Sequence, residues 1–222
     1  AVCDGQIDMY PEYRGTALLT ILDQPMETDP QVTYDTVKKM YAENFNLDVL
    51  DMCEASNGNG LTMRADVAEK YGIKTISDLQ ANAENIRFGG TSDTFEREDG
   101  LSGLEQTYGT FNFKSKNTFD NSLKYQAMEN DEVDCVPAYT TDAQLSSNEF
   151  ILLEDDKHFW PPYNIIPVVR QKVINAHPDV AEIINKISAA IDTETMTKLN
   201  AQVDIDKEEY EDVAADFYAT IK

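Results

Sequence analysis

Short apolar runs alternate with longer amphipathic segments along the whole chain, and this alternation predicts the architecture. Period-two or continuous apolar runs of four to eight residues indicate strands. The runs predicted as strands are QIDMY, LDVLDMCEA, the start of LTMRADVAEKYG, NIRFGGT, VDCVPAY and FILLEDD, and WPPYNIIPVVR is predicted to start irregular and become extended. Because helical segments follow most of these runs, the pattern predicts an α/β fold with mostly parallel sheets.

The helical segments carry end signals and apolar stripes. In DPQVTYDTVKKMYAENF, Asp29 or Thr28 can cap a helix, and Pro30 suits its first turn. Near the C-terminus, HPDVAEIINKISAAI is predicted as a strongly amphipathic helix. Its apolar residues stand at helical spacing: Val180, Ile183, Ile184, Ile187 and Ile191.

Composition limits the class of protein and its partners. The chain has 222 residues, of which 41% are apolar, enough for a large domain or two lobes with a buried core. Its net charge of −23 argues against nucleic acid as a partner, since phosphates repel an acidic surface. No run is long enough to span a bilayer, and no signal peptide is visible. We therefore expect a cytoplasmic protein, a trimmed mature chain or a fragment.

The sequence offers little catalytic or metal-binding chemistry. Cys3, Cys53 and Cys135 form no C-x-x-C pair, which favours small buried hydrophobes over a zinc site, although one disulfide stays open. The acidic segments LEDDKH and DIDKEE lack the calcium-loop pattern and are predicted as solvated turns. The segment SNGNG lacks the ending of a phosphate loop, and no nucleophile elbow is present. We expect no cofactor, no metal and no catalytic set.

Three tyrosines share a sequence context that suits ligand binding. Tyr13, Tyr139 and Tyr163 stand at or just after short apolar runs, next to proline, glycine or threonine. Residues at the carboxyl ends of strands line the ligand crevice of open α/β sheets. Tyrosine rings also attract cations, quaternary ammonium groups above all. Spacing alone nevertheless favours the simpler interpretation, in which these tyrosines are half-buried packing residues with a wet hydroxyl.

Arg97, in the segment FEREDG, also allows two interpretations. An arginine in a polar loop after a strand can clamp a carboxylate with two parallel hydrogen bonds. The alternative is a surface salt bridge with Glu96, Glu98 or Asp99, and the sequence alone favours it.

Four segments, in order along the chain, resemble one protein family: IDMYPEYRGTALLTIL, FEREDGLSGLEQTYG, YQAMENDEVDCVPAYTTDAQL and LLEDDKHFWPPYNIIPVVR. They are similar to the substrate-binding proteins of ABC importers for glycine betaine, choline, carnitine and related osmoprotectants. The resemblance implies a two-lobed, periplasmic-binding-protein-like α/β fold of type II, which closes over its ligand by hinge motion. We expect lobe 1 over 1–83 and 191–222, and lobe 2 over 84–190.

The resemblance also implies which residues bind the ligand. In this family, tyrosines from both lobes form a cage around the trimethylammonium group, and the motifs place Tyr13, Tyr139 and Tyr163 in that cage. Thr16 matches a polar contact beside the first tyrosine. Arg97 matches the residue that holds the carboxylate of betaine-type ligands.

The chain departs from the family pattern in two places. Gly60 stands where the family usually has a further cage tyrosine, and Gly58 where an acidic or amide residue is common. With Tyr10 and Asn57, these glycines are further cleft-lining candidates. The chain also begins after the family's first strand, helix and second strand. Lobe 1 is therefore expected to be incomplete at its N-terminus and to self-associate through the exposed edge.

These features predict an extracytoplasmic solute-binding component that delivers a quaternary ammonium compound to the membrane permease of an ABC importer. We expect a cell-surface lipoprotein, a periplasmic protein or a domain fused to the permease. The alternative is a ligand-sensing or interaction module that has lost transport. An enzyme on the same scaffold ranks last, because acid, base and nucleophile sets are absent.

Overall fold

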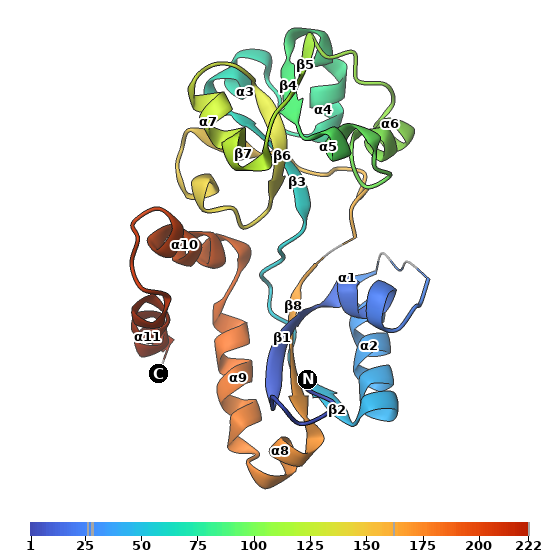
Figure 1. The fold of residues 1–222 in the computed structure, drawn as a ribbon, viewed down its shortest axis with the longest axis vertical. Coiled ribbons are helices and arrows are strands. Elements are labelled where there is room, and N and C mark those ends of the chain that lie inside the picture. Colours follow the sequence, from blue (N-terminus) through green and yellow to red (C-terminus); the bar gives the residue numbers. More distant parts are fainter. Residues whose placement is uncertain (26, 28, 162, 222) are drawn as a thin grey trace. The chain divides into compact units, whose positions relative to one another are not determined.

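The computed structural model describes residues 1–25, 27, 29–161 and 163–221, which form two compact units (Figure 1). Unit 1 combines Ala1–Gly58 with Pro161–Lys222, and unit 2 is the continuous segment Asn59–Trp160. The predicted lobes divided the chain elsewhere, at 84 and 190. Strand pairing explains the difference, because the strand that begins at Asn59 already pairs within the sheet of unit 2.

Unit 1 contains a three-stranded antiparallel sheet in the order β1-β8-β2. The strands are β1 (Met9–Tyr13), β2 (Leu47–Val49) and β8 (Ile165–Arg170). The central strand β8 places Ile165 opposite Tyr13 and Val168 opposite Val49. The helices are α1 (Arg14–Thr16), the π-helical turn η1 (Ala17–Ile21), α2 (Pro30–Phe45), α8 (Gln171–Ala176), α9 (Asp179–Ala190), α10 (Thr193–Asp204) and α11 (Tyr210–Ile221).

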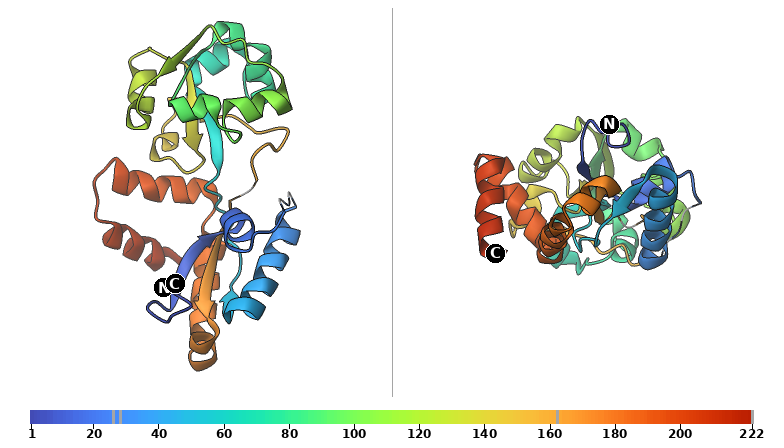
Figure 2. Two further views of the ribbon diagram at one scale, coloured as in Figure 1. Left: turned by 45° about the vertical axis from the view of Figure 1, so that its right-hand side comes forward. Right: turned by 90° about the horizontal axis from the view of Figure 1, so that it is seen from below.

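Helix α2 begins where the sequence predicted. The Asp29 carboxylate accepts hydrogen bonds from the backbone N–H groups of Gln31 and Val32 at 2.8 and 3.0 Å, which confirms Asp29 as the cap. Thr28, the other predicted cap, lies outside the described residues. Figure 2 shows α2, in light blue, beside the sheet of unit 1. Its buried Val37 and Tyr41 pack with Val168 of β8 in the core of this unit.

Helix α9 is confirmed, but its apolar stripe is less buried than its periodicity suggests. Val180, Ile184 and Ile187 are half-buried, and Ile183 is 43% exposed. The contacts of α9 include the neighbouring helices α8 and α11, and Asn185 of α9 accepts the backbone N–H of Asp51 at 3.0 Å.

Unit 2 contains a five-stranded mixed sheet in the order β5-β4-β6-β3-β7. Its strands are β3 (Asn59–Arg64), β4 (Arg87–Gly90), β5 (Ser115–Thr118), β6 (Cys135–Tyr139) and β7 (Phe150–Leu152). The helices are α3 (Ala65–Tyr71), α4 (Ile76–Ala81), α5 (Ser92–Glu96), α6 (Leu101–Tyr108) and α7 (Lys124–Glu129), with 3-10 turns η2 (Ala83–Asn85), η3 (Asn121–Leu123) and η4 (Ala143–Ser146).

The α/β architecture is as predicted, but the expectation of mostly parallel sheets is wrong. Strand β4 pairs in parallel with β5 and β6, whereas β3 and β8 pair antiparallel with all of their partners in the described residues. The cause is topological, because β3 and β8 follow the two points at which the chain passes from one unit to the other.

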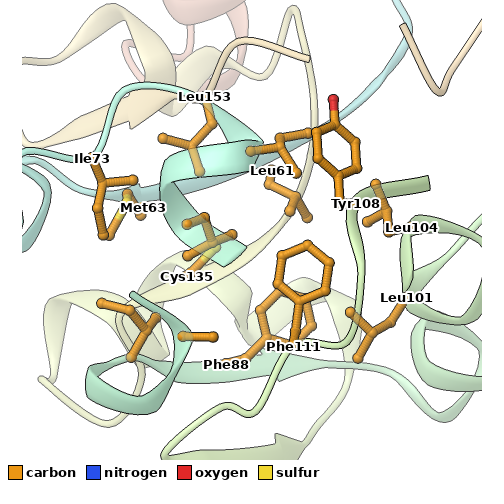
Figure 3. Packing of buried hydrophobic residues seen from close by; sticks show 14 of the residues in the cluster. Leu61, Met63, Ile73, Phe88, Leu101, Leu104, Tyr108, Phe111, Cys135 and Leu153 are labelled. Atoms are coloured by element: carbon orange, nitrogen blue, oxygen red, sulfur yellow. The ribbon is translucent and has the colours of Figure 1, made fainter. Parts of the chain in front are cut away.

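The core of unit 2 fixes the strand ends that carry its functional residues. Leu61 of β3 faces Leu104 and Tyr108 of α6 in Figure 3, within one cluster of buried side chains. Phe88 of β4 is completely buried in the same cluster, and its ring stacks on Phe113 with centroids 4.6 Å apart. Strands β3 and β4 are therefore held by buried packing.

The three cysteines are free thiols. Cys53 and Cys135 are buried, as predicted, and burial raises the pKa of each thiol. Cys3 is exposed, contrary to the prediction, because it lies in the turn that precedes β1.

The helices are short relative to a bilayer. α2 has 16 residues, whereas a membrane-spanning helix needs about 20 consecutive apolar ones. Within the described part of the chain, no helix combines the length and the apolar content that a membrane crossing requires.

Candidate functional site

A cavity of about 370 Å³ lies on unit 2, which is within the size range of small-molecule sites. Its walls come from β3, the end of β6, α5 and the loop that follows it, the start of α6 and the start of α7. Three sequence-predicted residues line it, namely Gly60, Arg97 and Tyr139. The fold thus brings together residues that are far apart in the sequence.

Tyr139 lies at this cavity because β6 ends there. The first two residues of the strand, Cys135 and Val136, are buried in the sheet, whereas Tyr139 is 49% exposed. Its backbone N–H donates to Asp142 Oδ2 at 3.2 Å, which fixes the turn after the strand. The ring is therefore presented to the cavity and not to the core.

A largely buried ion pair lies beside this ring, and its Lys124 also lines the cavity. Lys124 Nζ donates to Asp142 Oδ2 at 2.7 Å and lies 5.6 Å from the centroid of the Tyr139 ring. The Tyr125 hydroxyl donates to the same oxygen at 2.8 Å, and burial raises the pKa of Tyr125, so it stays a donor. Lys124 was missed from the sequence, because its role depends on the packing of α7 against β6.

Arg97 forms the surface salt bridge that the sequence favoured. Its Nε donates to Asp99 Oδ1 and its Nη2 to Asp99 Oδ2, both at 2.7 Å. These hydrogen bonds hold the pKa of Asp99 below its usual value and raise the pKa of Arg97. Both residues line the cavity, so the salt bridge and the predicted carboxylate clamp share one location.

The loop that carries this pair is held on both sides. The Trp160 indole Nε1 donates to the carbonyl oxygen of Asp99 at 2.9 Å. Asp155 in turn accepts the backbone N–H groups of Phe159 and Trp160, each at 3.0 Å. A Cβ at Gly100 would collide with the carbonyl oxygen of Thr94, so only glycine lets the loop pass this close to α5.

A second group of predicted residues gathers in unit 1. Tyr13, at the end of β1, is 36% exposed, and its hydroxyl accepts a hydrogen bond of 3.2 Å from Asn57 Nδ2. The backbone N–H of Tyr163 donates to Ser56 Oγ at 3.2 Å, and its carbonyl accepts from Asn57 N–H at 3.1 Å. Asn57 therefore links both tyrosines.

Two glycines border the Tyr163 ring. A Cβ at Gly15 would lie 3.0 Å from Cε1 of the ring, and a Cβ at Gly58 would lie 3.7 Å from Cδ2 on the other edge. The ring thus rests directly on the backbone of α1. Gly15 was missed from the sequence, where it reads only as a residue of a strand-to-helix junction.

Tyr10 and Thr16 lie apart from these contacts. Tyr10 packs against the core of unit 1, its hydroxyl donates to Glu12 Oε2 at 3.1 Å, and burial raises the pKa of Tyr10. An odd separation along β1 places Tyr10 and Tyr13 on opposite faces of the strand. Thr16 is half-buried in α1, directly after Gly15.

Comparison with known proteins gives a consistent result. Residues 1–220 match the family model described as the substrate binding domain of the ABC-type glycine betaine transport system. The ergothioneine transport permease/ergothioneine binding protein EgtU of Helicobacter pylori (strain G27) is 36% identical over 217 residues, which cover 98% of this chain and 39% of that protein. The carnitine transport binding protein OpuCC of Listeria monocytogenes serotype 1/2a (strain 10403S) is 31% identical over 219 residues, 98% of this chain and 71% of that protein.

A solved structure shares the whole fold. The crystal structure of a glycine betaine/carnitine/choline ABC transporter superimposes with a TM-score of 0.93 at 28% identity, covering 99% of this chain and 81% of that one.

Proposed function

Because the chain belongs to the family of substrate-binding domains of ABC-type glycine betaine transport systems, we propose that it captures a small quaternary ammonium compound for an ABC importer. Its fold is the predicted type II periplasmic-binding-protein fold. The family consists of substrate-binding proteins and not enzymes, which confirms the prediction against catalysis. The alternative of a sensing or interaction module without transport is not favoured.

The proposed ligand carries a trimethylammonium group and a carboxylate. The named ligands of the relatives, ergothioneine and carnitine, share these two groups, as does glycine betaine. The observation that carries the proposal is the placement of Arg97 and Tyr139 on one cavity of unit 2. A guanidinium suits a carboxylate and an aromatic ring suits a quaternary ammonium group, so this pair matches both ends of the ligand.

We further propose that Tyr13 and Tyr163 of unit 1, with Thr16 beside them, contact a quaternary ammonium ligand. The support comes from the family resemblance of the motifs, together with the exposure of Tyr13 and the hydrogen bonds through which Asn57 links the two tyrosines. Tyr10 is left out of this proposal, since its ring packs into the core of unit 1.

Gly60 suggests a ligand larger than glycine betaine. It lines the cavity, and a Cβ there would lie 2.9 Å from Cδ1 of Leu152, so any side chain at this position requires the end of Leu152 to shift. The chain lacks the ring that the family pattern places at this position, and one well-placed aromatic wall is worth about 1–2 kcal/mol to a desolvated cation. We expect glycine betaine to bind roughly tenfold or more weakly than a bulkier betaine, which can make further contacts in the cavity in place of the missing ring.

Calorimetric titration with glycine betaine, carnitine, ergothioneine, proline betaine and choline tests these proposals. Arg97→Ala should weaken the carboxylate-bearing ligands at least about tenfold and leave choline nearly unchanged. Tyr139→Ala should weaken all of them, and Gly60→Tyr should favour glycine betaine over ergothioneine. Tyr210→Ala is the control, because Tyr210 is 66% exposed on α11 and lies outside the cavity. Unchanged affinities in Arg97→Ala and Tyr139→Ala would contradict the site.

The place of action is proposed to be outside the cytoplasm, with a membrane permease as the partner. Of the three predicted arrangements, fusion to the permease is supported by the Helicobacter pylori relative, whose name includes both a permease and a binding protein. The chain spans 39% of that relative. Immunoblotting of fractionated cells tests this, since a fused protein would be much larger than 25.0 kDa and would sediment with membranes.

Self-association through unit 1 stays a prediction. Met9 and Tyr13 on β1 are 43% and 36% exposed, so this edge of the sheet offers apolar surface. Sedimentation at increasing protein concentration tests it, and a monomer at every concentration would contradict it.

A further inference from the structure

Arg97 already holds a carboxylate that belongs to the protein. The two parallel hydrogen bonds to Asp99, both 2.7 Å long, have the fork geometry that a guanidinium makes with any carboxylate. Asp99 lines the same cavity as Arg97. A ligand carboxylate that approaches this edge of the guanidinium would meet both an occupied donor pair and a like charge.

The ion pair of Arg97 and Asp99 is exposed enough for another carboxylate to reach Arg97. The Arg97 and Asp99 side chains are 62% and 49% exposed, whereas the neighbouring pair of Lys124 and Asp142 is 10% and 17% exposed. Exposed ion pairs contribute only about 0.2–1 kcal/mol, so another carboxylate can replace Asp99 at small cost. The backbone of Asp99 stays anchored by Trp160, which keeps its carboxylate close to Arg97 after displacement.

We propose that Asp99 is a specificity-determining residue that competes with the ligand carboxylate for Arg97. This inference rests on the proposed role of Arg97 in binding that carboxylate. A simple carboxylate gains one contact, with Arg97. Arg97 loses its contact with Asp99 at the same time, so the net gain in binding free energy is small. A betaine gains the aromatic contacts as well, so the competition selects ligands that carry both a carboxylate and a quaternary ammonium group.

Calorimetry on Asp99→Asn tests the competition. The substitution keeps the shape of the side chain and removes its charge, so we expect glycine betaine and carnitine to bind about two- to fivefold more tightly. Choline, which has no carboxylate, should change less than twofold. Asp93→Asn is the matched control for the loss of a nearby charge, because Asp93 lines the same cavity and acts on Arg97 through its charge, whereas in the described residues Asp99 is the one of the two whose side chain also accepts hydrogen bonds from Arg97. A loss of betaine affinity in Asp99→Asn as large as in Arg97→Ala would overturn the proposal, since Asp99 would then position the arginine.

A second measurement separates this inference from the proposed function. Acetate is a carboxylate without an ammonium group, and its binding is followed by the NMR signal of the Arg97 Nε–H. We expect acetate to shift this signal at severalfold lower concentration in Asp99→Asn than in the wild type. If no quaternary amine binds any variant, the proposed ligand class fails, and the acetate titration still decides the role of Asp99. Equal acetate titrations in both proteins would overturn the competition.

Discussion

The side-chain amide of Asn57 donates a hydrogen bond of 3.2 Å to the hydroxyl of Tyr13. The bond connects the end of β1 with the segment that leads into β3, and it holds the hydroxyl of a partly exposed tyrosine at a strand end. Asn57 is therefore placed to orient an aromatic ring without contacting the core.

We expect Asn57→Ala to weaken betaine binding about two- to fivefold, because a hydrogen bond of this kind contributes about 0.5–1.5 kcal/mol. Calorimetry on Asn57→Ala, Tyr13→Phe and the double variant measures the coupling. The losses of binding free energy in the two single variants should sum to more than the loss in the double variant, since either substitution removes the same hydrogen bond. Fully additive losses would mean that Asn57 does not act through Tyr13.

Gly15→Ala should weaken ligand binding without weakening the fold. The new methyl group would lie 3.0 Å from the Tyr163 ring, so the ring must move by a few tenths of an ångström. Alanine stabilises a helical turn by about 0.5–1 kcal/mol relative to glycine, and this gain in folding free energy offsets the strain of the closer contact. Gly58→Ala is the control, because its methyl group would make an ordinary contact of 3.7 Å with the same ring. Calorimetry measures the affinity of each variant, and thermal denaturation measures its stability. Equal effects of the two substitutions on affinity would contradict this expectation.

The cap of α4 should give unit 2 a specific acid dependence. Asp78 accepts the backbone N–H groups of Lys74 and Thr75, both at 3.0 Å, and these bonds lower the pKa of Asp78 below 3.8. A lowered pKa means that this stabilisation is complete above pH 3.8 and is lost as the pH falls through the lower, folded-state value. Asp78→Ala should lower the free energy of unfolding by about 1 kcal/mol at pH 7. The difference in unfolding free energy between this variant and the wild type should narrow towards pH 3.

Thr75→Ala provides the comparison for that titration. Thr75 Oγ1 accepts the backbone N–H of Asp78 at 3.0 Å, so it caps the same helix without a titratable group. Urea denaturation from pH 7 to pH 3 should show a loss of stability for Thr75→Ala that narrows less than the loss for Asp78→Ala, because the Thr75 side chain contributes less to the lowered pKa of Asp78 than the backbone N–H groups do. A loss for Asp78→Ala that stays constant over this range would show that its charge is not involved.

Asp142→Ala should destabilise unit 2 more than Lys124→Met. Asp142 accepts hydrogen bonds from Lys124, Tyr125 and the backbone of Tyr139, whereas Lys124 donates one. Removing the acceptor leaves largely buried donors without a partner, at a cost of about 2 kcal/mol or more. Lys124→Met keeps two of the three hydrogen bonds to Asp142 and should lower the free energy of unfolding by less. Chemical denaturation of both variants measures this difference. A larger cost for Lys124→Met would mean that the charge and not the hydrogen bonding dominates.

Local signals in the sequence predicted the local structure well. Asp29 caps α2 because aspartate and the following proline encode that end directly. The salt bridge of Arg97 was also predictable, since its partner Asp99 is two residues away. Tyr139 and Arg97, which the family motifs assign to one binding site, both line the cavity of unit 2, and their role in binding stays a prediction.

Features that depend on long-range pairing were not predictable in the same way. The strand at Asn59 reads as part of lobe 1 in the sequence, and only its pairing with β6 and β7 assigns it to unit 2. Lys124 has no motif of its own, and Gly15 matters only because Tyr163 lies on it. Each of these roles arises from a neighbour that is distant in sequence.

The two units become complete at different times while the chain is synthesised. Unit 2 is one continuous segment, so all of its strands leave the ribosome before the chain returns to unit 1. In unit 1, Met9 pairs with Val169, and β1 must wait for β8 while the whole of unit 2 is translated. Such non-local pairing is slow to form, because a long loop has to close first. The ring of Tyr13 therefore reaches its final place late in folding, after the cavity that holds Arg97 and Tyr139 has formed.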